Sequence, residues 1–108
     1  MAVDYKVLGQ SAPLAAVLTD VYTVPAETSA IISTISVCSR DAAAYIRIAV
    51  RPGGGAISNE HYIVHDVLLQ QYEALFLTVG VTLSTGDVIS VYNEEERASF
   101  SIFGSEVT

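Results

Sequence analysis

The stretch YIRIAVR, residues 45–51, decides the fold class of this chain. Side chains of a β-strand alternate between its two faces, so a strand here has one apolar face and one mixed face. The apolar face carries Ile46, Ile48 and Val50, and the other carries Tyr45, Arg47 and Arg51. We therefore expect one face of this strand to enter a core and the other to meet solvent or a partner.

The same alternation recurs along the whole chain, in short runs rich in β-branched and aromatic residues between Gly, Pro, Asn, Asp and Ser. The runs fall at about 3–9, 15–24, 29–38, 43–51, 61–69, 73–83, 87–93 and 97–104. Helix signals are nearly absent, and residues 15–20 could be loop or a short helical turn. The pattern predicts an all-β fold of about eight strands in two antiparallel sheets packed face to face. Strand count slightly favours a jelly roll over an immunoglobulin-like sandwich.

Length and composition restrict the class of protein further. The 108 residues fit one domain, and no linker divides residues 1–108. A hydrophobic fraction of 51% indicates a folded core, and a net charge of −7 with scattered basic residues argues against nucleic-acid binding. The apolar runs are far shorter than the ~20 residues of a membrane span. Cys38 is the single cysteine, so no intrachain disulfide forms, and its apolar run predicts a buried small side chain.

The segment NEHYIVHDV, residues 59–67, contains both histidines and is the strongest candidate for chemistry. In a strand, His61 and His65 lie about 13 Å apart on one face, too far to share a zinc ion bound at about 2 Å. No further histidine and one cysteine remain to complete a site. We predict no metal site and no cofactor, with both histidines partly exposed on a sheet face.

Two other segments invite functional readings that their details do not support. The glycines of RPGGGAISNE, residues 51–60, are not followed by the lysine, hydroxyl and helix of a phosphate loop. We therefore expect a flexible connection between two strands, which could also join the two sheets. Glu94–Glu96 are consecutive, so their side chains diverge, and a solvated hairpin tip is the expectation. No Gly-x-Ser-x-Gly sequence is present. The sequence predicts a protein that is not an enzyme.

One surface remains as a candidate partner-binding face, formed by Tyr45, Arg47 and Arg51. Tyrosine and arginine are enriched at protein interfaces, and such a face could also stack on sugar rings. An ordinary solvated sheet face is the alternative. The chain ends, residues 1–9 and 103–108, alternate apolar and polar residues, so either could add a strand to a neighbouring chain.

Taken together, several segments carry a family resemblance over nearly the full chain. They are KVLGQSAP (6–13), VYTVPAETSAIISTISVCSR (21–40), YIRIAVRPGGGAI (45–57), HYIVHDV (61–67), TGDVISVY (85–92) and FSIFGSEVT (100–108). In this the chain resembles small structural proteins of tailed bacteriophages, cyanophages among them. The resemblance implies a virion component without catalytic activity. It carries no set of binding residues over to this sequence.

Small acidic all-β proteins of this kind are often capsid cement (decoration) proteins. The resemblance therefore implies binding to the major capsid protein on the outer capsid surface, after assembly in the host cytoplasm, and a homo-oligomer, by analogy a trimer. Neither nucleic acid nor membrane is an expected partner. The alternative is a tail-associated or tail-fibre module for host receptor or glycan binding. A hydrolase is a third reading, which requires His61 and His65 to fold together.

Overall fold

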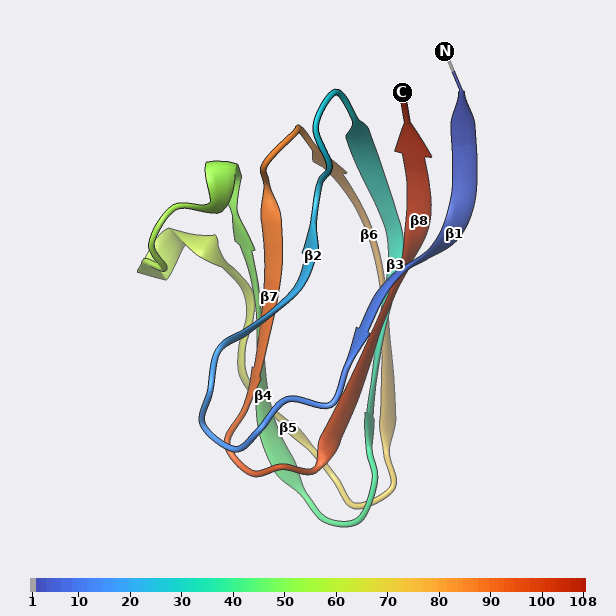
Figure 1. Ribbon diagram of the computed structural model, residues 1–108. Helices are drawn as coiled ribbons and strands as arrows, with labels where there is room; N and C mark the ends of the chain where they lie inside the picture. Colours follow the sequence, from blue (N-terminus) through green and yellow to red (C-terminus); the bar gives the residue numbers. More distant parts are fainter. Residues whose placement is uncertain (1) are drawn as a thin grey trace.

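The computed structural model describes residues 2–108 and holds eight strands in two antiparallel four-stranded sheets, with no α-helix in this part of the chain (Figure 1). The strands are β1 (Val3–Ser11), β2 (Thr19–Thr23), β3 (Ser29–Ser39), β4 (Ala44–Arg51), β5 (Tyr62–Leu69), β6 (Ala74–Leu83), β7 (Val88–Asn93) and β8 (Ala98–Val107). Two 3-10 turns, η1 (Pro52–Gly54) and η2 (Asn59–His61), lie between β4 and β5. The predicted all-β sandwich of eight strands is confirmed.

The order of strands resolves which sandwich this is. Sheet A runs β1-β8-β3-β6 and sheet B runs β2-β7-β4-β5. Every connection except β4 to β5 therefore crosses from one sheet to the other. In an immunoglobulin-like sandwich the first two strands share a sheet, whereas here β1 and β2 lie in different sheets. The observed order is that of an eight-stranded jelly roll.

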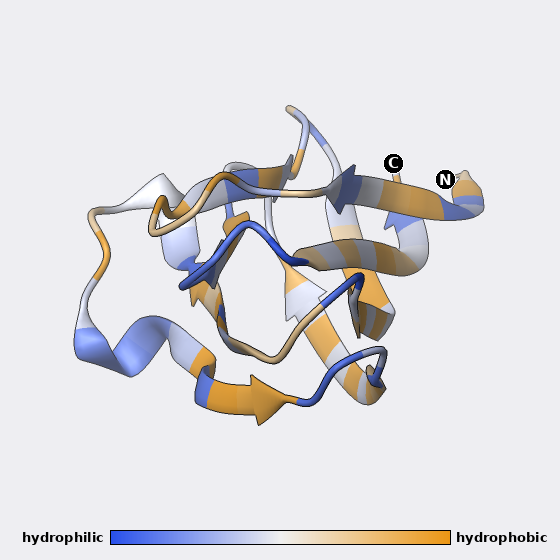
Figure 2. Cartoon of the chain, turned by 90° about the horizontal axis from the view of Figure 1, so that it is seen from below, coloured by the Kyte–Doolittle hydropathy of each residue, from blue (hydrophilic) through white to orange (hydrophobic). Residues whose placement is uncertain are grey.

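A single apolar layer fills the space between the sheets. The alternation predicted in β4 holds, because Ile46 and Ile48 are fully buried while Tyr45 is 44% exposed. Ile35, Phe100 and Ile102 of sheet A meet them from the other side of the same core cluster. In Figure 2 the strands show this pattern as alternating hydrophobic and hydrophilic bands. Among residues 2–108, no buried side-chain nitrogen or oxygen atom lacks a hydrogen-bond partner.

The buried Asn93 at the end of β7 organises the loops beneath the sandwich. Its Nδ2 donates to the carbonyl oxygens of Pro13 and Leu14 at 3.2 and 3.3 Å, and its Oδ1 accepts the N–H groups of Arg97 and Ala98, each at 3.1 Å. One side chain thus holds the β1–β2 connection against the β7–β8 connection. This fixes where residues 94–97 leave the sheet.

Two connections differ from the expectation. The glycine-rich segment joins β4 to β5 within sheet B, so the reading of a link between the sheets is wrong. The exposed run Glu94–Glu96 is solvated as expected, but it lies on the crossing from β7 to β8 rather than at a hairpin tip.

The two chain ends pair with one another, because β1 lies antiparallel to β8. β8 sits between β1 and β3, so both of its edges are filled and the C-terminal strand cannot pair with a neighbouring chain. β1 has only one filled edge, so of the two strands it is β1 that could pair with a neighbouring chain. Figure 1 shows the two ends side by side at one end of the sandwich.

A polar tie joins the sheets at that same end. Tyr22 of β2 donates its hydroxyl to Glu106 of β8 at 2.6 Å, and Lys6 of β1 lies 2.6 Å from the other oxygen of this carboxylate. The hydrogen bond from Lys6, and then that from Tyr22, lower the pKa of Glu106, while burial and this carboxylate raise the pKa of Tyr22. The tie therefore depends on an ionised Glu106.

We expect Glu106→Gln to lower the free energy of unfolding by about 1 kcal/mol at pH 7. Since the pKa of Glu106 is lower in the folded chain than its ordinary value of 4.5, its contribution is present above that value. It is lost as the pH falls through the folded pKa, so wild type and variant should converge in acid. Urea unfolding at several pH values measures this. Glu95→Gln, at an exposed position, is the control and should leave the pH dependence unchanged.

Gly104 of β8 is required by a close approach of backbones inside sheet A. A Cβ built there would overlap the carbonyl oxygen of Ile31 and lie 3.1 Å from the Cα atom of Ile32. Both atoms belong to the backbone of β3, so neither can move aside cheaply. We expect Gly104→Ala to lower the free energy of unfolding by about 1–3 kcal/mol. Gly55→Ala is the matched control, because its Cβ would meet only ordinary contact, and an equal loss in both variants would contradict this account.

Candidate functional site

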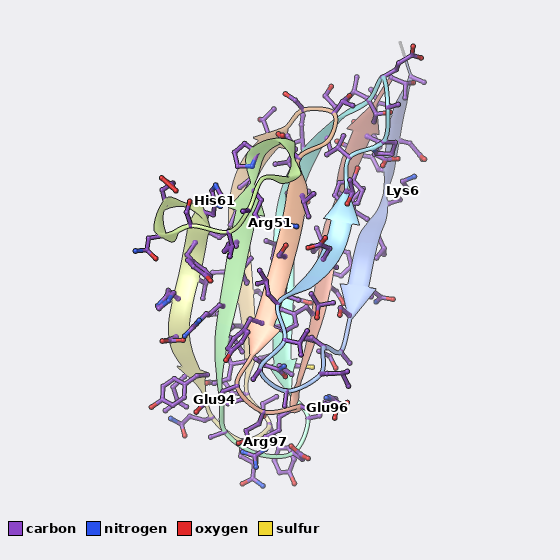
Figure 3. The ribbon with its side chains drawn as sticks, turned by 60° about the vertical axis from the view of Figure 1, so that its left-hand side comes forward. Lys6, Arg51, His61, Glu94, Glu96 and Arg97 are labelled. Atoms are coloured by element: carbon purple, nitrogen blue, oxygen red, sulfur yellow. The ribbon has the colours of Figure 1, made fainter. Side chains whose placement is uncertain are left out.

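The structure divides the candidate face of β4 into two separate places. Tyr45 and Arg47 line a pocket of about 280 Å³ together with Asp66, Tyr92 and Glu94. Arg51 lies about 13 Å from Arg47 along the strand, and Figure 3 shows it near the β4–β5 connection, at the opposite end from Glu94. Only two of the three residues predicted from the sequence thus belong to one site.

Arg47 is the centre of the pocket. Its Nε and Nη2 donate to the two carboxylate oxygens of Asp66 at 2.6 and 3.2 Å, which is the two-pronged geometry of arginine with a carboxylate. The guanidinium carbon also lies 4.6 Å from the ring centre of Tyr92 and 5.9 Å from that of Tyr62. Hydrogen bonds and two aromatic rings together fix the direction of this cation.

A β-bulge in β5 brings Asp66 to Arg47. Val67 pairs with Ile46 and His65 with Arg47, so Asp66 has no opposite residue, and its φ of 53° is left-handed. Aspartate tolerates this backbone region better than most residues. The bulge aims the carboxylate at the guanidinium, and the hydrogen bond from Arg47 lowers the pKa of Asp66. Asp66 is therefore ionised at neutral pH and cannot act there as a general acid.

Glu94 and Tyr45 form the open side of the pocket. The Glu94 N–H donates to the carbonyl oxygen of Tyr45 at 3.0 Å, so backbone pairing holds the two residues together. The Glu94 side chain is exposed and makes no hydrogen bond or ion pair within residues 2–108. The pocket combines two tyrosines, one cation and two carboxylates, a set of groups suited to binding a polar ligand with an apolar face.

Arg51 has a structural role that the sequence pattern did not indicate. Its Nε donates to Ser90 Oγ at 3.1 Å and its Nη2 to Asp20 Oδ1 at 2.7 Å. Its Nη1 donates to the carbonyl oxygens of Gly54 and Gly55 at 3.3 and 2.9 Å. Four of the five N–H donors of the guanidinium are thus used inside the chain. The glycine-rich connection is held to the sheet by this residue.

The two histidines occupy different settings. His61 ends the turn η2, where its Nδ1 accepts the N–H of Ser58 at 3.1 Å. His65 lies on β5, with its ring edge-on to Tyr62 at 4.8 Å and its Nδ1 3.6 Å from Asp66. Within residues 2–108, no group of three or more His, Cys, Asp or Glu side chains is placed to hold a metal ion.

The outer face of sheet A is a second surface of note, which sequence reasoning missed. The strand registers place only uncharged residues on it. They are Val3, Tyr5, Val7 and Gln10 of β1; Ser99, Ser101, Phe103, Ser105 and Val107 of β8; Ser29, Ile31, Thr34, Ser36 and Cys38 of β3; and Ala74, Phe76, Thr78 and Thr82 of β6. We call this set the uncharged face.

Large apolar side chains are open to solvent on the uncharged face. Tyr5 is 82% exposed and Phe76 69% exposed, and a shallow hollow runs between Tyr5, Ile31 and Phe103. Lys6 reaches the rim of this hollow, but its ammonium group is engaged by Glu106. Cys38 is exposed here, so the prediction that it is buried was wrong. Cys38 is exposed because its position in β3 points towards the outer face of sheet A, although its neighbours in the sequence are apolar.

Comparison with known proteins assigns no function to either surface. No family model matches the chain, and no curated protein matches its sequence. Within residues 2–108, no helix is long and apolar enough to cross a membrane. The pocket and the uncharged face are the two surfaces of the chain that bear on its function.

We expect Arg51→Lys to loosen the glycine-rich connection, because a lysine ammonium cannot reach the four acceptors of the planar guanidinium. The free energy of unfolding should fall by about 1–2 kcal/mol. Amide hydrogen exchange of residues 52–58 should become faster than in wild type. Arg40→Lys is the control, since the Arg40 side chain makes a single hydrogen bond, to the Glu96 carbonyl oxygen. Unchanged exchange of residues 52–58 in Arg51→Lys would contradict the role given to Arg51.

Proposed function

We propose that this chain is a non-enzymatic structural protein of a tailed-phage virion, namely a capsid cement protein that binds the major capsid protein on the outer capsid surface. The observation that carries the proposal is the uncharged face of sheet A on a protein of net charge −7. A face without charges can be buried against a partner without the cost of desolvating ions. The family resemblance of the sequence supports the same assignment.

The size of the uncharged face agrees with that use. Its four strands are 9 to 11 residues long. At about 4.8 Å between strands and about 3.3 Å per residue, they cover roughly 600 Å². A stable interface buries about 800 Å² on each partner, and side chains make the real surface larger than a flat rectangle. Exposed aromatic anchors such as Tyr5 and Phe76 are typical of such interfaces.

The other properties of the chain suit the same location. An acidic protein on the outside of a shell is kept apart from packaged DNA. The exposed and solitary thiol of Cys38 suits assembly in the reducing host cytoplasm. A homo-oligomer, by analogy a trimer, belongs to the proposal, and the open edge of β1 is the part of the sheet that could pair with a neighbouring copy. Jelly rolls occur in viral capsid domains, which supports the proposal by fold analogy alone.

A second candidate function is a tail-associated or tail-fibre module that binds a host receptor. The observation in its favour is the pocket around Arg47, with its aromatic and carboxylate lining. Jelly rolls also occur in lectins. The two candidates differ in where the protein sits in the virion.

Two measurements together test the leading proposal. Mass spectrometry of separated heads and tails should find the chain in many copies and confined to heads. Phe76→Glu should weaken binding of purified protein to heads stripped of it by about tenfold or more, because an unpaired carboxylate would be buried at the contact. Phe76 is largely exposed, so the substitution should leave folding intact.

Leu14→Glu is the matched control, since Leu14 is 62% exposed on the β1–β2 connection and away from the uncharged face. It should bind heads as wild type does. A chain found only in tails would overturn the cement proposal and favour the second candidate. Equal binding of Phe76→Glu and wild type to heads would overturn the role of the uncharged face.

A further inference from the structure

We infer that the pocket between β4, β5 and β7 binds one neutral hexopyranose unit of a glycan. The residues that carry this site are Tyr45, Arg47, Asp66, Tyr92 and Glu94. The inference does not depend on whether the chain sits on the head or the tail, and it can be tested on the isolated protein.

The size and aromatic lining of the pocket fit a single sugar ring. At about 280 Å³ it lies at the small end of ligand pockets. One face of a pyranose presents C–H groups, which pack on an aromatic ring. The Arg47 guanidinium already covers the Tyr92 ring at 4.6 Å, whereas Tyr45 is 44% exposed. Tyr45 is therefore the stacking platform.

The hydrogen-bonding groups of the pocket match vicinal hydroxyls, which both donate and accept. Asp66 uses two N–H donors of Arg47, so further donors of this guanidinium remain for a ligand. Within residues 2–108, the Glu94 carboxylate and the Tyr45 and Tyr92 hydroxyls make no hydrogen bond. A sugar hydroxyl can donate to Glu94 and accept from Arg47.

The charge of the pocket selects among sugars. Two carboxylates face one guanidinium, and the chain as a whole carries −7. Asp66 already neutralises Arg47, so no free cation remains to receive an acidic sugar or a phosphate. Glu94 would repel either of them. The site should therefore take a neutral hexose and reject sialic acid.

The pocket is also set in place before a ligand arrives. Asp66 and Tyr92 fix the Arg47 guanidinium, and Tyr45 and Asn93 hold the backbone on either side of Glu94. Binding then orders few side chains, which keeps its entropic cost low. One ring of about a dozen heavy atoms still supports only weak binding, with a Kd of about 1 mM.

The test is an NMR titration of ¹⁵N-labelled protein with the methyl glycosides of glucose, galactose and mannose, and with N-acetylneuraminic acid. At least one neutral glycoside should shift the amide signals of residues 45–47, 66 and 92–94 and saturate with a millimolar Kd. Tyr45→Ala and Glu94→Gln should each weaken this binding by about tenfold, while Tyr45→Phe should retain most of it. Tyr72→Ala, at a tyrosine 72% exposed on the β5–β6 connection, should bind as wild type does.

Three outcomes would overturn the inference. The first is that none of the three neutral glycosides gives localised shifts at about 50 mM, well above the Kd expected for such a ligand. The second is that sialic acid binds with equal affinity. The third is that Tyr45→Ala and Glu94→Gln bind the glycoside as wild type does. The amide spectrum of each variant shows whether it is folded, and Tyr45→Phe keeps the test open if Tyr45→Ala is not. Failure here leaves the binding of the chain to heads unaffected, so the two proposals are separately testable.

Discussion

A single apolar layer between two sheets is the constraint on which the rest of this molecule depends. Neither sheet buries its inner face alone, and six of the seven connections between strands pass from one sheet to the other. Side chains such as Ile35 and Ile48 come from opposite sheets and are fully buried in the one core. In strands such as β3, β4 and β8 roughly alternate residues serve this layer, so the residues between them are free to give the outer faces their own chemistry.

The outer faces of the two sheets differ in charge. The outer face of sheet A presents uncharged side chains. The outer face of sheet B presents Arg51 and the ion pair of Arg47 with Asp66, which lies beside the rings of Tyr62 and Tyr92. Outer faces of a sandwich point away from each other, and the shortest dimension of this one is 19 Å. In the proposed arrangement, a chain docked on a capsid through sheet A would turn the pocket of sheet B towards solvent. The two proposals are therefore compatible in one molecule.

Local irregularities, more than regular strands, place the functional groups. The bulge at Asp66 supplies the partner of Arg47, and the buried Asn93 fixes the connection that carries Glu94. Arg51 performs the same kind of task for the glycine-rich connection. Asn93 and Arg51 act by binding backbone groups of the connections, and Asp66 acts by binding the Arg47 guanidinium.

The sequence by itself determined the number of strands, their approximate limits and the inward side of β4, because alternation is a local property. It also pointed to Tyr45 and Arg47 as candidate binding residues. Only the tertiary structure decided between jelly roll and immunoglobulin-like order, since both give the same alternation. It alone separated Arg51 from the pocket, joined Asp66, Tyr92 and Glu94 to it, and exposed Cys38. A bulge such as that between Ile32 and Thr34 switches which residues of a strand point inward. The residues of the pocket come from strands that are far apart in the chain. Both features follow from the register of strand pairing and not from the local sequence pattern.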